Sequence, residues 1–155
     1  MSKFKITTLI TSFVLLIIGI IFLFSSYRIV DVTEFAYKYD LVTGEVSGIW
    51  DEDGNPKTGW IWKTPFLEKV HTIETLPYRT CLGEENTRVL NCKLVQFNPK
   101  GWRQFVMWHG RRDYDHNRKG FSVTDYDLNK ILMAYAYSEN PSEYKFLEIT
   151  EDDSI

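Results

Sequence analysis

The sequence predicts an α+β protein in which an N-terminal transmembrane helix is followed by a small, mostly antiparallel β-sheet domain with two packed helices. Residues 6–24 form an uncharged, largely apolar run of the length that a membrane-spanning helix needs. Residues 27–97 contain several stretches in which apolar and polar side chains alternate, as in half-buried strands. After residue 98 the apolar side chains recur at helical spacing instead. Strands that precede helices along a chain are typical of α+β domains.

The apolar run at residues 6–24 contains no charged side chain, and its second half is almost entirely Leu, Ile, Val and Phe. As a helix rising about 1.5 Å per residue it spans roughly 28 Å, close to the ~30 Å apolar core of a bilayer. A cleaved signal peptide is one alternative, but its apolar region is shorter, and Leu23 or Phe24 stands where a small residue precedes the cut. A buried core helix is the other, and the length of the run disfavours it.

The charges that flank this run predict its orientation. Lys3 and Lys5 precede it without any acidic residue, so the positive-inside rule favours a cytoplasmic N-terminus and an exported, periplasm-facing domain. The chain is therefore expected to be a single-pass membrane protein. Its parts are a cytoplasmic stub and transmembrane helix at residues 1–26, one α+β domain at 27–149 and a disordered acidic tail at 150–155.

The first half of the domain is expected to consist of strands. Residues 27–42 alternate aromatic and polar side chains and are predicted to form the first strand. Residues 45–50 and 59–63 are predicted to pair as a hairpin around the turn-rich segment 51–58. Pro65 then ends the second of these strands, because proline cannot donate to a ladder. Further strands are expected at residues 67–76 and 88–97.

Two helices are expected in the second half of the domain. Asn98 is a good N-cap and Pro99 suits the first helical position, so a helix is predicted at residues 99–109, with Gly110 ending it. The apolar residues of 124–138 recur at helical spacing and predict the second helix.

The composition argues against several classes of function. The net charge of −3, which becomes more negative without the two N-terminal lysines, is opposite to what a general nucleic-acid binder needs. No nucleophile-elbow pattern is present, so neither catalysis nor a cofactor is predicted. The histidines His71, His109 and His116 lack the i, i+4 spacing of helical zinc ligands, and we predict no metal site.

Residues 51–62 imitate a calcium-binding loop only at its start. Asp51, Asp53 and Asn55 occupy the first three ligand positions. Pro56 stands where the invariant glycine belongs, and Trp62 where the bidentate glutamate belongs. We therefore predict a solvated hairpin tip instead of a calcium site.

The segment 32–75 resembles the opening of the stomatin/prohibitin/flotillin family, also called SPFH or band 7. The matching residues are Gly44-Glu45-Val46, the glycine–aromatic element GWIWKTPF at 59–66 and the charged-hydrophobic strand EKVHTIET at 68–75. The resemblance extends to the first subdomain only, since the family's second subdomain and long coiled coil are not recognisable in this chain.

This resemblance implies a non-enzymatic membrane scaffold or regulator that acts through protein–protein contacts. Such proteins associate laterally at a membrane patch and often modulate a membrane protease or channel. A form without the coiled coil is expected to act as an accessory subunit, or as a bacterial or phage version that interferes with a host membrane assembly. The expected partners are the lipid bilayer and a membrane protein or further copies of the chain.

Two groups of residues are candidates for contacts outside the domain. Trp60 and Trp62 alternate onto one face of their strand, and Phe66 lies where SPFH-like domains approach the bilayer; burial in the core is the alternative for all three. A basic group with interleaved aromatic residues is the candidate surface for anionic headgroups or an acidic partner, or else a solvated helix face and loop. The members of this basic group are Lys100, Arg103, Arg111, Arg112, Arg118 and Lys119.

Cys81 and Cys92 flank a turn and are expected to lie opposite each other on a hairpin. They form a disulfide if the domain is in an oxidising compartment, and two buried thiols otherwise.

Two other functions remain open from the sequence. One is an envelope binding module that uses the basic loop, and the other is a membrane-anchored hydrolase.

Overall fold

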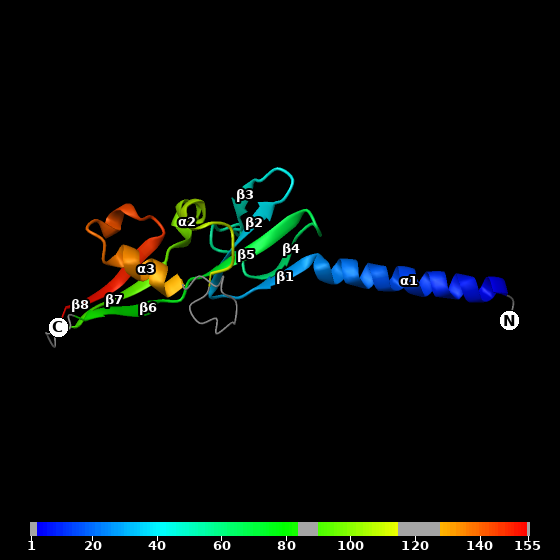
Figure 1. Ribbon diagram of the computed structural model, residues 1–155, viewed down its shortest axis with the longest axis horizontal. Helices are drawn as coiled ribbons and strands as arrows, with labels where there is room; N and C mark the ends of the chain where they lie inside the picture. The colour runs from blue at the N-terminus through cyan, green and yellow to red at the C-terminus, as the bar shows by residue number, and fades with distance from the viewer. Residues whose placement is uncertain (1–2, 84–89, 115–127, 155) are drawn as a thin grey trace.

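Three small antiparallel sheets are present in the part of the chain that the structure describes, and a long N-terminal helix leaves them at one end (Figure 1). The computed structural model describes residues 3–83, 90–114 and 128–154. Two shorter α-helices, α2 (Trp102–His109) and α3 (Leu128–Ala136), lie beside the sheets. The predicted α+β class with mostly antiparallel strands is therefore correct for the domain.

Helix α1 (Lys3–Ser25) corrects the prediction of a membrane anchor. Within the described residues, no helix is both long and apolar enough to cross a membrane. This finding contradicts the predicted transmembrane helix and, with it, the predicted location as a single-pass protein with a periplasm-facing domain. The large apolar side chains between Leu9 and Phe24 are exposed in the isolated chain.

A two-stranded sheet stands at the base of α1. It pairs β1 (Tyr27–Val30) with β4 (Gly59–Trp62), with Tyr27 opposite Trp62 and Ile29 opposite Trp60. Residues 31–33 separate β1 from β2 (Glu34–Asp40), so the predicted continuous strand at 27–42 is two strands.

The second sheet has the order β3-β2-β5 and corrects a predicted pairing. Strand β3 (Val46–Gly48) pairs with β2, and β5 (Glu68–Glu74) pairs with the other side of β2. The predicted hairpin between residues 45–50 and 59–63 is wrong, because β4 pairs with β1 instead. Residues 51–58 still form a turn, which the bridge between Trp50 and Pro56 closes.

The third sheet has the order β6-β7-β8. It consists of β6 (Tyr78–Gly83), β7 (Leu90–Phe97) and β8 (Leu147–Ser154). Strand β8 corrects the expectation of a disordered tail from residue 150, since its backbone pairs with β7 as far as Ser154 opposite Asn91. The apolar residues Leu147 and Ile149 pack against the core and draw the acidic segment into the sheet.

The helices follow the predicted capping signals. The side chain of Asn98 accepts a hydrogen bond from Lys100 N, and Pro99 opens a 3₁₀ turn, η1 (Pro99–Gly101), that leads into α2. The helix predicted at 99–109 is therefore correct. Of the helix predicted at 124–138, the structure describes α3, and residues 124–127 lie outside the described part. A second 3₁₀ turn, η2 (Pro141–Glu143), connects α3 towards β8.

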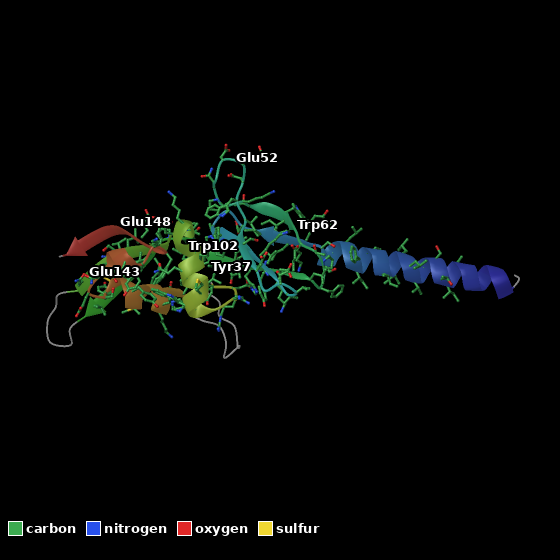
Figure 2. The ribbon with its side chains drawn as sticks, turned by 90° about the horizontal axis from the view of Figure 1, so that it is seen from above. Tyr37, Glu52, Trp62, Trp102, Glu143 and Glu148 are labelled. Carbon is green, nitrogen blue, oxygen red and sulfur yellow. A yellow bond between two sulfur atoms is a disulfide. The ribbon has the colours of Figure 1, made fainter. Side chains whose placement is uncertain are left out.

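The main core lies where α2 and α3 meet the second and third sheets. The rings of Tyr37 and Trp102 stack within it, with centroids 5.9 Å apart. Both residues are labelled in Figure 2. Phe35, Phe105 and Phe146 are fully buried around them. A smaller cluster lies on the opposite face of β2, where Ala36 packs with residues from the first and second sheets. These residues are Val30, Ile61 and Val70.

Candidate interaction surface

The sheet at the base of α1 presents an aromatic face to solvent. Tyr27 lies edge-on to both tryptophans, with ring centroids 5.8 Å from Trp60 and 4.9 Å from Trp62. Alternate residues of a strand share a face, so these rings and Ile29 lie on one side of the sheet while Val30 and Ile61 are buried on the other. Trp60 is 67% exposed and Trp62 48% exposed. We call Tyr27, Ile29, Trp60 and Trp62 the aromatic face.

Hydrogen bonds fix the aromatic face to the end of α1. Ser26 is completely buried, and its hydroxyl donates to the carbonyl oxygen of Phe22 at 2.6 Å. The backbone N–H of Lys63, directly after Trp62, donates to the Ser26 carbonyl oxygen at 2.8 Å. The helix therefore runs into β1 without a linker, and Trp62 lies close to the helix end, as Figure 2 shows.

A second apolar group lies at the turn that follows β4. Phe66 is 80% exposed and has a φ of 65°, a left-handed conformation that a bulky residue rarely adopts. The turn is held by Glu68, whose carboxylate accepts a hydrogen bond from Thr64 N at 2.6 Å and one from Lys38. These interactions, that of Thr64 first, hold the pKa of Glu68 below its ordinary value. The predicted contact residues Trp60, Trp62 and Phe66 are thus all exposed.

Leu67 joins this turn to the turn after β2, because Leu41 N donates to the Leu67 carbonyl oxygen at 2.8 Å. Leu41, Val42 and Leu67 are all exposed. We call these three residues and Phe66 the apolar tip. Only residues 63–65 separate Trp62 from Phe66, so the apolar tip lies at most about 14 Å along the chain from the aromatic face.

An ionic network on Asp113, which the sequence did not reveal, ties the first sheet to the segment after α2. Oδ1 of Asp113 lies 3.3 Å from Arg28 Nη2 and 3.4 Å from His71 Nδ1, and it accepts a hydrogen bond from Thr72 N at 2.8 Å. Burial opposes ionisation of this carboxyl. The interactions with His71, Thr72 and Arg28 outweigh it and lower the pKa of Asp113 to about 2.

We expect Asp113→Asn to remove about 2 kcal/mol of stability at neutral pH. The folded-state pKa of about 2 is below the ordinary value of 3.8, so the ionised carboxylate stabilises the fold above about pH 4. This contribution is lost as the pH falls from about 4 through about 2. Urea unfolding of the wild type and the variant across this range measures it. Asp53→Asn, at an exposed turn, serves as the control, and parallel stability curves for wild type and Asp113→Asn would contradict the assignment.

In the described residues, the predicted basic group is spread over η1, α2 and the segment that follows α2. Lys100 lies in η1 and Arg103 in α2, while Arg111 and Arg112 follow α2. The guanidinium of Arg103 lies over the ring of Trp102, and that of Arg111 lies 4.3 Å from the ring centre of Tyr39. Arg118 and Lys119 lie outside the described residues. Among the interleaved aromatic residues, Trp102, Phe105 and Tyr114 belong to the core.

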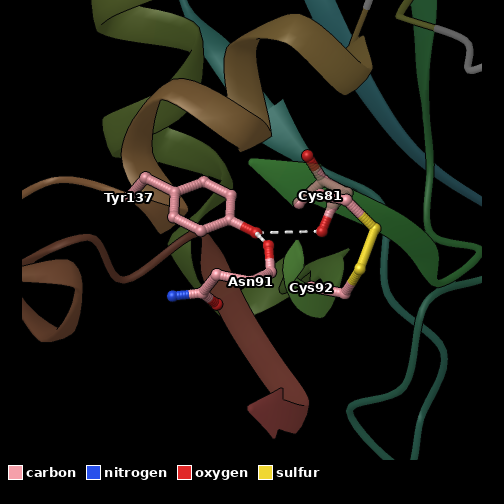
Figure 3. Close-up of a disulfide and its surroundings, with 5 residues drawn as sticks. Cys81, Asn91, Cys92 and Tyr137 are labelled. Carbon is pink, nitrogen blue, oxygen red and sulfur yellow. Dashed lines mark hydrogen bonds between the residues drawn. A yellow bond between two sulfur atoms is a disulfide. The ribbon is translucent and has the colours of Figure 1, made fainter. Parts of the chain in front are cut away.

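The cysteines are joined by a disulfide in the structure. Cys81 of β6 lies directly opposite Cys92 of β7, with the Cα atoms 4.0 Å apart (Figure 3). The predicted hairpin thus places these two residues side by side. Residues 84–89, which contain the expected turn, lie outside the described part.

The remaining polar candidates serve local structure. The carboxylate of Asp51 accepts hydrogen bonds from Asp53 N and Asn55 N and so closes its own turn. His109 packs on Phe105 among core aromatic rings, and burial, followed by the charge of Arg112, lowers its pKa. Within the described residues, no group of three or more His, Cys, Asp or Glu side chains is arranged to hold a metal ion. His116 lies outside them.

No protein-family model matches the chain, and no curated protein matches it.

Proposed function

We propose that this chain is a non-enzymatic interaction module that works at a membrane surface, where the aromatic face contacts the headgroup layer of the bilayer. The observation that carries the proposal is the exposure of Trp60 and Trp62 beside Tyr27, at the end of an exposed apolar helix. Tryptophan and tyrosine favour the membrane–water interface, because their rings are apolar and carry a polar group. The proposal does not depend on a spanning helix.

The apolar tip supports the same orientation. A left-handed Phe66 held out into solvent is costly, and strained residues cluster at functional sites. Monomeric soluble proteins rarely keep extended apolar surfaces in water, so a set of exposed aromatic and aliphatic side chains indicates a contact surface.

The SPFH-like segment 32–75 completes the proposal. By that resemblance, the module organises a membrane patch through lateral contacts with copies of itself or with a membrane protein, and regulates a partner such as a membrane protease. The aromatic face and the apolar tip both fall in or next to this segment. The domain would then lie against the membrane at its α1 end, with the third sheet directed away from it.

Tryptophan fluorescence tests the membrane contact. The full chain is mixed with phosphatidylcholine vesicles whose acyl chains are brominated near the headgroups, because bromine quenches only those rings that reach the lipid. We expect strong quenching of the wild type and its loss in the double variant Trp60→Phe, Trp62→Phe. Trp108→Phe is the matched control, since Trp108 is a half-exposed tryptophan on α2, and this variant should be quenched like the wild type. Equal quenching in the double variant, or no quenching at all, would refute the contact.

Chemical crosslinking on unlabelled vesicles tests the scaffold role separately. Lateral assembly predicts crosslinked species larger than the monomer that appear with vesicles and decrease in the Trp60→Phe, Trp62→Phe variant. If only monomer is found at every ratio of protein to lipid, the proposal of lateral assembly is wrong, while the proposal of a membrane contact is unaffected.

A further inference from the structure

The Cys81–Cys92 disulfide joins an exposed residue to a buried one. Cys81 is an exposed residue of the edge strand β6, whereas Cys92 on the central strand β7 is only 6% exposed. In thiol–disulfide exchange a thiolate attacks along the S–S bond, so access decides which sulfur reacts. The geometry directs an incoming thiol to Cys81.

Tyr137, which directly follows α3, binds the same two strands from the other side of the hairpin (Figure 3). Its hydroxyl lies 2.9 Å from the carbonyl oxygen of Thr80 and 2.6 Å from that of Asn91, and its single proton is shared between them. Thr80 and Asn91 are the residues directly before Cys81 and Cys92. The hydroxyl therefore contacts both strands at the level where the disulfide joins them.

Lys93 strengthens the attachment of the helix. Its ammonium donates to the carbonyl oxygen of Ala136, the last residue of α3, at 3.0 Å and lies 4.9 Å from the ring centre of Tyr137. Lys93 is also the register partner of Thr80. The end of α3 is thus held by β6 and β7 together, and its position depends on the spacing of these strands.

We propose that the Cys81–Cys92 disulfide is a site of reversible exchange with a dithiol reductant, and that its reduction releases the end of α3 through Tyr137. The reductant's thiolate attacks Sγ of Cys81, the S–S bond breaks, and the electron pair leaves with Sγ of Cys92, which takes up a proton. The second thiol of the reductant then displaces Cys81. The reductant ends as a disulfide and the protein as two thiols.

The consequence for α3 follows from strand spacing. With the disulfide closed, the Cα atoms of Cys81 and Cys92 are held 4.0 Å apart. Once the bond is cut, the strands can separate, and the carbonyl oxygens of Thr80 and Asn91 move out of joint reach of one hydroxyl. Losing such a hydrogen bond corresponds to about a fivefold change in a local opening equilibrium.

Mass spectrometry tests the site of attack. The oxidised full chain is exposed briefly to glutathione, a monothiol that leaves a mixed disulfide, and is then quenched with acid. We expect the adduct on Cys81. An adduct mainly on Cys92, or no adduct under conditions that reduce an exposed model disulfide, would overturn the assignment.

Hydrogen exchange tests the coupling to α3 in the absence of vesicles, so the result is independent of the membrane proposal. Reduction with dithiothreitol should speed amide exchange in residues 128–137 by about fivefold. Tyr137→Phe should show this faster exchange already when oxidised and gain little on reduction. Tyr135→Phe, a matched change within α3, should respond to reduction like the wild type. The coupling would be overturned if reduction left the amide exchange rates of α3 unchanged in the wild type. It would also be overturned if reduction accelerated exchange in Tyr137→Phe as much as in the wild type.

Discussion

Gly101→Ala is expected to lower the free energy of unfolding by about 3 kcal/mol or more. Gly101 is buried in η1, and a Cβ atom placed on it would overlap the backbone of Lys145 and Phe146. Contact with backbone is costly, since backbone moves less readily than the end of a side chain. Urea unfolding of the full chain measures the loss.

The surrounding structure prevents a simple adjustment around Gly101. The Phe146 carbonyl oxygen accepts a hydrogen bond from Asn98 N at 2.7 Å, and the Phe146 ring is fully buried against Phe105. Gly19→Ala is the control, because a Cβ there meets nothing within 4 Å. A Gly101→Ala protein as stable as the control would show that the segment before β8 is free to shift.

Phe105→Ala is expected to cost about 3–5 kcal/mol of stability. Phe105 is fully buried at the centre of the main core, and its ring contacts three aromatic rings from different parts of the chain. These are Phe97 at 5.2 Å, Tyr114 at 4.8 Å and Phe146 at 5.2 Å between ring centroids. Its removal leaves a cavity that none of these neighbours can fill alone.

Met107→Ala is the matched control for this change. Met107 lies on the same helix but is 80% exposed, so its truncation should alter stability by no more than about 0.5 kcal/mol. Thermal or urea unfolding compares the two variants. Equal effects of the two changes would mean that α2 is not packed as the structure shows.

Local signals predicted the elements of this fold well. Asn98 and Pro99 mark the start of a helix within a few residues, and the alternation through Trp60 and Trp62 placed both rings on one face of a strand. Local signals do not specify which of several distant segments a strand pairs with. Hence β4 was expected beside residues 45–50 but pairs with β1.

Predictions made from the composition of a segment were wrong where packing against the rest of the chain determines its structure. The acidic character of residues 150–155 predicted a tail, yet two preceding apolar residues, Leu147 and Ile149, anchor the strand in the sheet. The network on Asp113 was beyond prediction for the same reason as the strand pairing. Its partners Arg28 and His71 are far from it in the sequence, and Asp113 itself stands in an ordinary polar stretch.

The buried Ser26 at the end of α1 makes the junction between helix and domain a stiff coupling. The carbonyl oxygen of Phe22 and the N–H of Lys63 hold Ser26 from both sides, so no swivel separates α1 from β1. A turn of the helix about its own axis must therefore rotate Trp60 and Trp62 by the same angle. A partner that binds α1 and fixes its orientation therefore also fixes the orientation of the aromatic face.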